Sequence, residues 1–142
     1  MKIVIIDGQG GKMGRSVIEQ LHTLYPDLEL YAIGTNSIAT SAMLKAGADY
    51  GATGENPAIV NSQDADIIIG PIGIVMANAL LGEITPSMAA AIGSSRAYKI
   101  LIPVNRCNHF IVGCQNNSLS DYISMVCEEV GKEVNTRENR RI

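Results

Sequence analysis

The chain has 142 residues, of which 46% are hydrophobic and 18% charged, and its formal net charge is −3. This length suits one domain and excludes a nucleotide-binding domain joined to a separate substrate domain. The mildly acidic balance argues against a nucleic-acid surface, which needs a basic stripe. The low charge fraction indicates an additional hidden surface, either inside a core or between subunits.

The predicted elements start with an apolar β-branched run at residues 3–6, typical of a strand that is covered on both faces. A glycine-rich stretch follows, and then a helix that ends at Pro26 and has its apolar face at Val17, Ile18, Leu21 and Leu24. Residues 28–33 predict a second strand. Ser37 is a candidate N-cap for the next helix, whose apolar face is formed by Ile38, Ala42, Met43 and Ala46.

The middle of the chain has a less regular pattern. Residues 50–53 predict a short strand, and Asn56 with Pro57 resembles the start of a helix over residues 57–65. Ile59 and Val60 fit a strand equally well, so both alternatives stay open. A strand at residues 67–69, a turn at residues 70–73 and a helix over residues 74–81 follow.

The last third begins with Thr85 and Pro86, which predict a helix that continues to about residue 94. Strands are expected at residues 99–102 and 110–113. Ser118 and Asp121 suit a capping box for a final helix with its apolar face at Leu119, Ile123, Val126, Cys127, Val130 and Val134. This alternation predicts one doubly wound, Rossmann-like α/β domain over residues 1–134, with a mainly parallel sheet flanked by helices. We interpret residues 135–142 as a basic, solvated tail.

The strongest site signal is the glycine loop, residues 8–14, because it lies between a predicted strand and a predicted helix. Gly8, Gly10 and Gly14 form G-x-G-x-x-x-G, and Gly8, Gly11 and Gly14 form G-x-x-G-x-x-G. Either spacing allows a tight turn and a close approach of the backbone to a pyrophosphate at the helix start. The candidate binding residues here are Gly8, Gln9, Gly10, Gly11, Lys12, Met13 and Gly14. Met13 follows Gly11-Lys12 where a Walker A loop needs Ser or Thr.

The end of the second predicted strand bears on the type of nucleotide. An NAD site usually has an acidic residue there to hold the ribose hydroxyls. This chain has Thr35, Asn36 and Ser37, which are neutral donors, so NADP is weakly favoured over NAD. Asp7 is unusual beside a pyrophosphate site, and we expect it either to pair with Lys12 or to cap the glycine turn.

Other strand ends should lie at the same edge of the sheet. Gly70, Pro71, Ile72 and Gly73 resemble a loop that packs on a nicotinamide ribose, or form a simple turn. Asn105 and Arg106 follow a late strand, and Arg106 suits a carboxylate or a phosphate. A zinc site at Cys107, His109 and Cys114 is disfavoured because this spacing matches no common zinc pattern. The three cysteines and the lack of a visible signal peptide or membrane span favour a cytoplasmic protein.

Two resemblances extend this reading. The segment Gly8-Gln9-Gly10-Gly11-Lys12-Met13-Gly14-Arg15 resembles the glycine loop of dihydrodipicolinate reductases, but nothing else of that family is present. Over nearly the whole length, the chain resembles the domain-of-unknown-function 3842 family of small bacterial Rossmann-like proteins. The matching stretches are residues 6–11, 32–36, 51–56, 68–74 and 102–107. The resemblance implies the fold and leaves the activity open.

The sequence therefore supports three hypotheses. The first is a homo-oligomeric domain that binds a dinucleotide or a related phosphorylated ligand, as a sensor or as part of an enzyme. The second is a small NAD(P)-dependent oxidoreductase completed across a dimer interface, with a proton donor among Tyr50, His109, Lys12 and Cys107. The third is an interaction module with a vestigial glycine loop. Neither a nucleic acid nor a membrane is expected as a partner.

Overall fold

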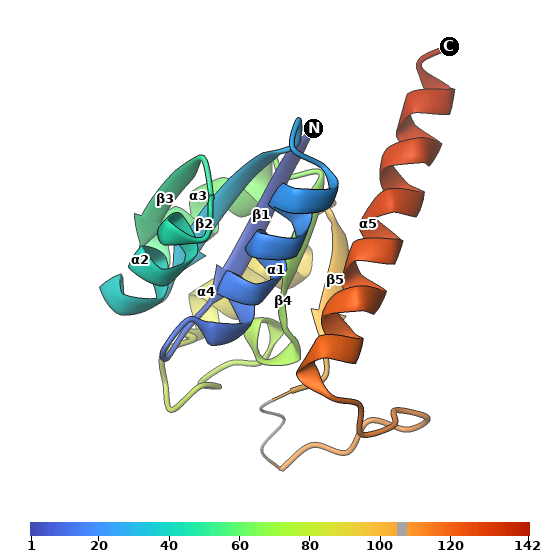
Figure 1. Ribbon diagram of the computed structural model, residues 1–142. Helices are drawn as coiled ribbons and strands as arrows, with labels where there is room; N and C mark the ends of the chain where they lie inside the picture. The colour runs from blue at the N-terminus through green and yellow to red at the C-terminus, as the bar shows by residue number, and fades with distance from the viewer. Residues whose placement is uncertain (105–107) are drawn as a thin grey trace.

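The computed structural model describes residues 1–104 and 108–142 (Figure 1). In these residues the strands are β1 Lys2–Asp7, β2 Glu29–Gly34, β3 Tyr50–Thr53, β4 Ile67–Pro71 and β5 Tyr98–Ile102. The helices are α1 Lys12–Leu24, α2 Ser37–Lys45, α3 Glu55–Gln63, α4 Pro86–Ser94 and α5 Leu119–Arg140, with a short 3₁₀ helix, η1, at Ile72–Val75.

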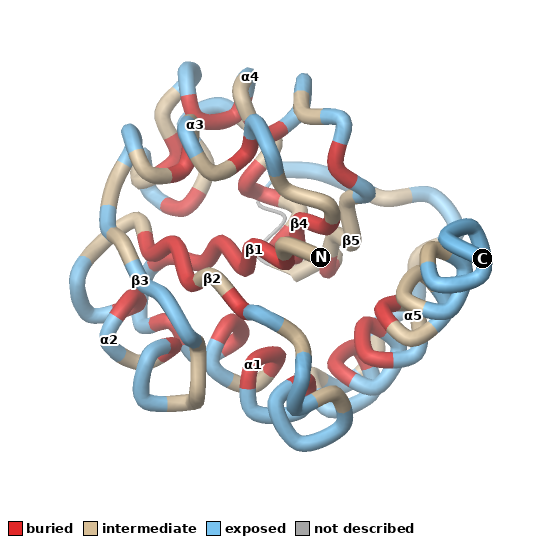
Figure 2. Tube along the Cα trace, turned by 90° about the horizontal axis from the view of Figure 1, so that it is seen from above, coloured by how far each residue is buried: buried red, intermediate tan, exposed pale blue. Residues whose placement is uncertain are grey.

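The five strands form one parallel sheet in the order β3-β2-β1-β4-β5. Helices α1, α2 and α5 cover one face, and α3 and α4 cover the other (Figure 2). The chain changes faces between β3 and β4, so the strand order reverses beside β1, the central strand, and α5 returns to the first face after β5. This arrangement is the single α/β domain of Rossmann-like type expected from the alternation of elements.

Strand β1 separates two apolar cores. Ile3 and Ile5 pack with α1, α2 and α5, whereas Val4 and Ile6 pack with α3, α4 and η1. All four side chains are fully buried, because successive residues of a strand point to opposite faces and both faces are covered. The continuous apolar run at residues 3–6 is therefore explained, because its side chains alternate between two cores that share β1.

The structure corrects two expected helix starts. Asn36 caps α2, because its side chain accepts a hydrogen bond from the Ala39 amide at 2.9 Å, and Ser37 is the first helical residue. The segment around Ile59 is helical, but α3 starts at Glu55 rather than after an Asn56 cap. The caps expected at Thr85 and Ser118 are confirmed, since each side chain accepts a bond from the amide three residues on.

Two other expected elements were wrong. Residues 74–81 form η1 and a series of turns instead of a helix, and Asn78, Leu80 and Leu81 have positive φ angles. Residues 110–113 contain no strand, and Phe110 is 85% exposed. The local spacing of apolar residues was consistent with both predicted elements. In residues 74–81, however, packing against the sheet determines the backbone conformation.

Helix α5 stands beside β5 and projects past the end of the sheet (Figure 1). It continues to Arg140, through most of the basic tail. Arg137 Nη1 lies 2.7 Å from Asp66 Oδ1, and Asp66 Oδ2 accepts a bond from the Lys2 amide at 2.6 Å. These contacts join the end of α5 to the starts of β4 and β1. No helix in the described part of the chain is both long and apolar enough to cross a membrane.

Candidate functional site

The glycine loop forms a tight turn between β1 and α1, at the carboxyl edge of the sheet. The Gly11 amide donates to the Gly8 carbonyl at 2.9 Å. Gly11 has a φ of +73°, and a Cβ there would lie 2.7 Å from the Cα of Ala39 in α2. Gly11 is therefore required both by its backbone conformation and by the close approach of α2.

Asp7 closes the inner side of the glycine loop. Asp7 is 5% exposed, and its carboxylate accepts hydrogen bonds from the Gly8 amide at 2.8 Å and the Gly14 amide at 2.7 Å. Burial raises the pKa of Asp7, and the two backbone donors oppose this shift. Of the two expected roles, Asp7 caps the glycine turn, while Lys12 is exposed.

Two amides at the start of α1 are not used by Asp7. Within residues 1–104 and 108–142, the amides of Gly10 and Lys12 have no hydrogen-bond partner. Both residues line a cavity of about 280 Å³, together with the other residues from Asp7 to Met13 and with Leu80, Val104 and Leu119. Ligand pockets usually measure about 300–1,000 Å³. The cavity therefore suits a phosphate-bearing part of a nucleotide, and the rest of such a ligand would extend along the sheet edge.

A loop from the far side of β1 reaches this site. We name residues 76–85, between η1 and α4, the strap. Its Glu83 carboxylate accepts hydrogen bonds from the Gln9 amide at 3.0 Å, the Thr35 hydroxyl at 2.9 Å and the Asn36 side-chain amide at 2.6 Å. Asn36 also donates to the Gln9 carbonyl at 2.9 Å. One carboxylate thus joins the glycine loop to the end of β2.

The structure brings some of the predicted site residues together and separates others. Thr35 and Asn36 meet Gln9 through Glu83, whereas Ser37 lines a different hollow with Arg15 and Lys45. Glu83 was missed by the sequence analysis. It follows Gly82, between the helix expected over residues 74–81 and the helix expected from Thr85, and no motif marked it.

The segment Gly70–Gly73 is not a free turn. Gly70 and Pro71 are the last residues of β4, and Ile72 and Gly73 begin η1. A Cβ on Gly73 would lie 3.3 Å from the Cβ of Ala79, so the strap packs over this segment. Asn105, Arg106 and Cys107 lie outside the described residues, and the predictions for them are therefore untested.

Of the four expected proton donors, Lys12 lines the site, Tyr50 lies away from it, and Cys107 is outside the described residues. Tyr50 begins β3, at the amino edge of the sheet, and its ring contacts the Tyr31 ring at a centroid distance of 4.8 Å. His109 is exposed and lies in the segment after β5. Among the residues that the structure describes, no group of three His, Cys, Asp or Glu side chains could hold a metal ion.

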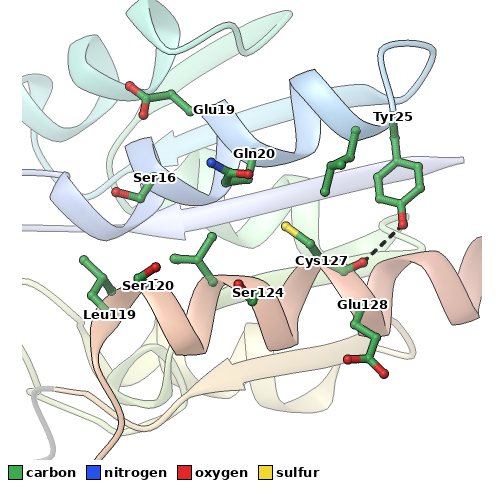
Figure 3. A pocket seen from close by; sticks show the side chains of 11 residues that line it. Ser16, Glu19, Gln20, Tyr25, Leu119, Ser120, Ser124, Cys127 and Glu128 are labelled. Carbon is green, nitrogen blue, oxygen red and sulfur yellow. Dashed lines mark hydrogen bonds between the residues drawn. The ribbon is translucent and has the colours of Figure 1, made fainter.

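A larger hollow of about 680 Å³ lies between α1 and α5 (Figure 3). Ser16, Ser120 and Ser124 line it, and the Tyr25 hydroxyl donates to the Cys127 carbonyl at its end, at 3.4 Å. Burial raises the pKa of the Cys127 thiol and so keeps it protonated. Among the described residues that line this hollow, Glu19 and Glu128 are the charged ones and no Lys or Arg is present, so it offers no cationic group to a phosphate. We therefore assign the candidate site to the glycine loop.

The comparisons with known proteins identify a family and give no related structure. Searches of the curated proteins and of the solved structures found no match to the chain. A family model described as Domain of unknown function (DUF3842) matches residues 2–135, which include all five strands and most of α5. On this match over nearly the whole length, the chain belongs to the DUF3842 family.

Proposed function

We propose that the protein binds a phosphorylated nucleotide of the NAD(P) type at the glycine loop, as a sensor or as one part of an enzyme. The observation that carries the proposal is a pair of amides, those of Gly10 in the loop and of Lys12 at the start of the 13-residue helix α1, that have no hydrogen-bond partner among the described residues. Both lie on a cavity at the carboxyl edge of a parallel sheet. Such edges, at the point where the chain changes faces, are where nucleotides bind in this class of fold.

The electrostatics of the loop are compatible with an anion. The positive end of the α1 dipole and the exposed Lys12 favour negative charge at the cavity. The buried Asp7 carboxylate opposes it, but its hydrogen bonds use the Gly8 and Gly14 amides and not those of Gly10 and Lys12. A phosphate that accepts from the Gly10 and Lys12 amides therefore does not compete with Asp7 for hydrogen-bond donors.

The test is a thermal-shift panel with NAD, NADH, NADP, NADPH, FAD, ATP and ADP-ribose. A ligand present at ~100 times its Kd stabilises the folded state by ~2.7 kcal/mol. A stabilisation of that size raises the Tm of a domain of this size by several degrees. We expect such a shift with at least one dinucleotide.

The matched variants are Gly10→Asp and Gly93→Asp. A Cβ at either position meets nothing within 4 Å, so both chains should fold, and Gly93 lies on α4 away from the loop. Gly10→Asp places a carboxylate beside the Gly10 and Lys12 amides and should abolish the ligand-induced shift. Gly93→Asp should keep it. A panel with no shift, or a shift that survives Gly10→Asp, would leave the vestigial loop as the better explanation.

A further inference from the structure

We infer that Glu83 selects nucleotides with a free ribose 2′-hydroxyl, so that the site takes NAD in preference to NADP. This inference rests on the proposed function. Nucleotide sites of this fold class place an acidic residue at the end of β2, where it accepts hydrogen bonds from the ribose. In this chain the strap brings an acidic side chain to that position from elsewhere in the sequence.

The position of the Glu83 carboxylate is defined from two strands. Thr35 and Asn36, directly after β2, donate to its Oε1 at 2.9 and 2.6 Å, and the Gln9 amide after β1 donates to its Oε2 at 3.0 Å. A Cβ on Gly8 would lie 3.4 Å from the same Oε2. The carboxylate therefore lies beside the glycine turn and the end of β2 at once.

The hydrogen bonds leave room for a ligand on one oxygen. Oε1 accepts from two side chains and, at 3.3 Å, from the Gln9 amide that it shares with Oε2, so both of its lone pairs are used. Among the described residues, Oε2 accepts only from that Gln9 amide, so one lone pair remains available. A ribose hydroxyl can donate to that position, whereas a phosphate oxygen carries no proton to donate at neutral pH.

The negative charge of Glu83 also favours NAD over NADP. A 2′-phosphate bound here would face the Glu83 carboxylate, and like charges at contact distance repel strongly where water is partly excluded. Among the described residues, no Lys or Arg forms an ion pair with Glu83. We therefore expect NAD to bind about 10-fold or more tightly than NADP. The proposal departs from the weak preference for NADP that Thr35, Asn36 and Ser37 suggested.

The experiment titrates the wild-type protein, Glu83→Gln and Glu138→Gln with NAD and NADP by calorimetry. Glu138→Gln is the control, since it makes the same change of charge on an exposed helix position. The wild type and the control should prefer NAD. Glu83→Gln should bind NAD several-fold more weakly and NADP more tightly, so that the preference disappears.

Glu83→Asp provides a second test if the glutamine variant does not fold. It keeps the negative charge but withdraws the carboxylate by one methylene, so NAD binding should weaken while NADP stays disfavoured.

Two results would overturn the inference and leave the proposed function standing. One is a wild type that prefers NADP or does not discriminate. The other is a Glu83→Gln variant that binds both nucleotides equally more tightly, as expected if Glu83 merely blocks an anion site. A wild type that binds no nucleotide would remove the proposed function itself.

Discussion

Asp7 shows how one buried side chain links the glycine loop to the stability of the fold. Its two oxygens accept from the Gly8 and Gly14 amides, which have no other acceptor in the described structure. Asp7→Asn keeps the shape but turns a donor toward one of these amides. We expect a loss of about 1–2 kcal/mol in the free energy of unfolding at pH 7, measured by urea denaturation.

The pH dependence of this loss follows from the raised pKa of Asp7. Because the folded state holds the proton more tightly than the unfolded state, protonation of Asp7 stabilises the fold below the ordinary pKa of 3.8. That contribution is lost as the pH rises through the folded-state value. The wild type should therefore gain stability relative to Asp7→Asn as the pH falls from 7 toward 4. A stability difference between the two proteins that stays constant or shrinks over this range would contradict the raised pKa of Asp7.

Single side chains also show where local patterns mislead. Ile38 was expected on the buried face of its helix, but it is 69% exposed, and the neighbouring Ala39 is buried. The reason is tertiary packing: the Ala39 backbone lies against the glycine loop, so close that a Cβ on Gly11 would be 2.7 Å from the Ala39 Cα, and this turns Ala39 inward. A shift of one residue rotates a helix by about 100°, since 3.6 residues make one turn.

At the scale of an element, α5 is fastened near its end by Arg137. The guanidinium contacts Asp66 through Nη1 at 2.7 Å and Glu133 through Nε at 2.8 Å. Arg137→Met keeps the aliphatic stem and removes both contacts. We expect a loss of about 1 kcal/mol, appropriate to a partly exposed ion pair, and a smaller loss in 1 M salt. Arg140→Met, on an exposed position of the same helix, should cost nearly nothing in the same denaturation series.

The elements that the sequence predicted correctly are those in which local signals and tertiary packing agree. The five strands of the sheet and the helix after Thr85 are of this kind. The strap is not, because Leu80 and Ile84 are buried against α3 and α4 while Glu83 turns toward the glycine loop. The hydrogen bonds of Glu83 to Thr35 and Asn36 join residues more than 40 positions apart, and no local window of sequence contains both partners.

At the scale of the whole molecule, the two cores should unfold together because β1 belongs to both. Ile5→Val trims the core beneath α1 and α5, and Ile6→Val trims the core beneath α3 and α4. Each should lower the free energy of unfolding by about 0.5–1.5 kcal/mol. Far-UV circular dichroism and tyrosine fluorescence should still follow one transition. Separate midpoints for the two probes would show that the faces unfold independently.

The same two cores bear on the oligomeric state. An apolar stretch over residues 74–92 could have suggested a subunit interface, but Ile74, Ile84, Met88 and Ile92 are buried within the chain itself. They therefore supply no interface.

For the candidate site, the sequence located the glycine loop through glycine spacing. Glu83 could not be found in this way, because its role depends on the course of the strap.

The central place of β1 has a consequence for synthesis on the ribosome. β1 pairs with β2 on one side and with β4 on the other, and β4 begins at Ile67. At ~5–20 residues per second, translation needs several seconds to pass from the first strand to the fourth. During that interval β1 has at least one unpaired edge, and the helices that cover its apolar side chains are not all in place. An unpaired apolar strand edge can pair with another chain, so the nascent chain is prone to misassembly at this stage. Chaperone binding would therefore be most useful before β4 emerges.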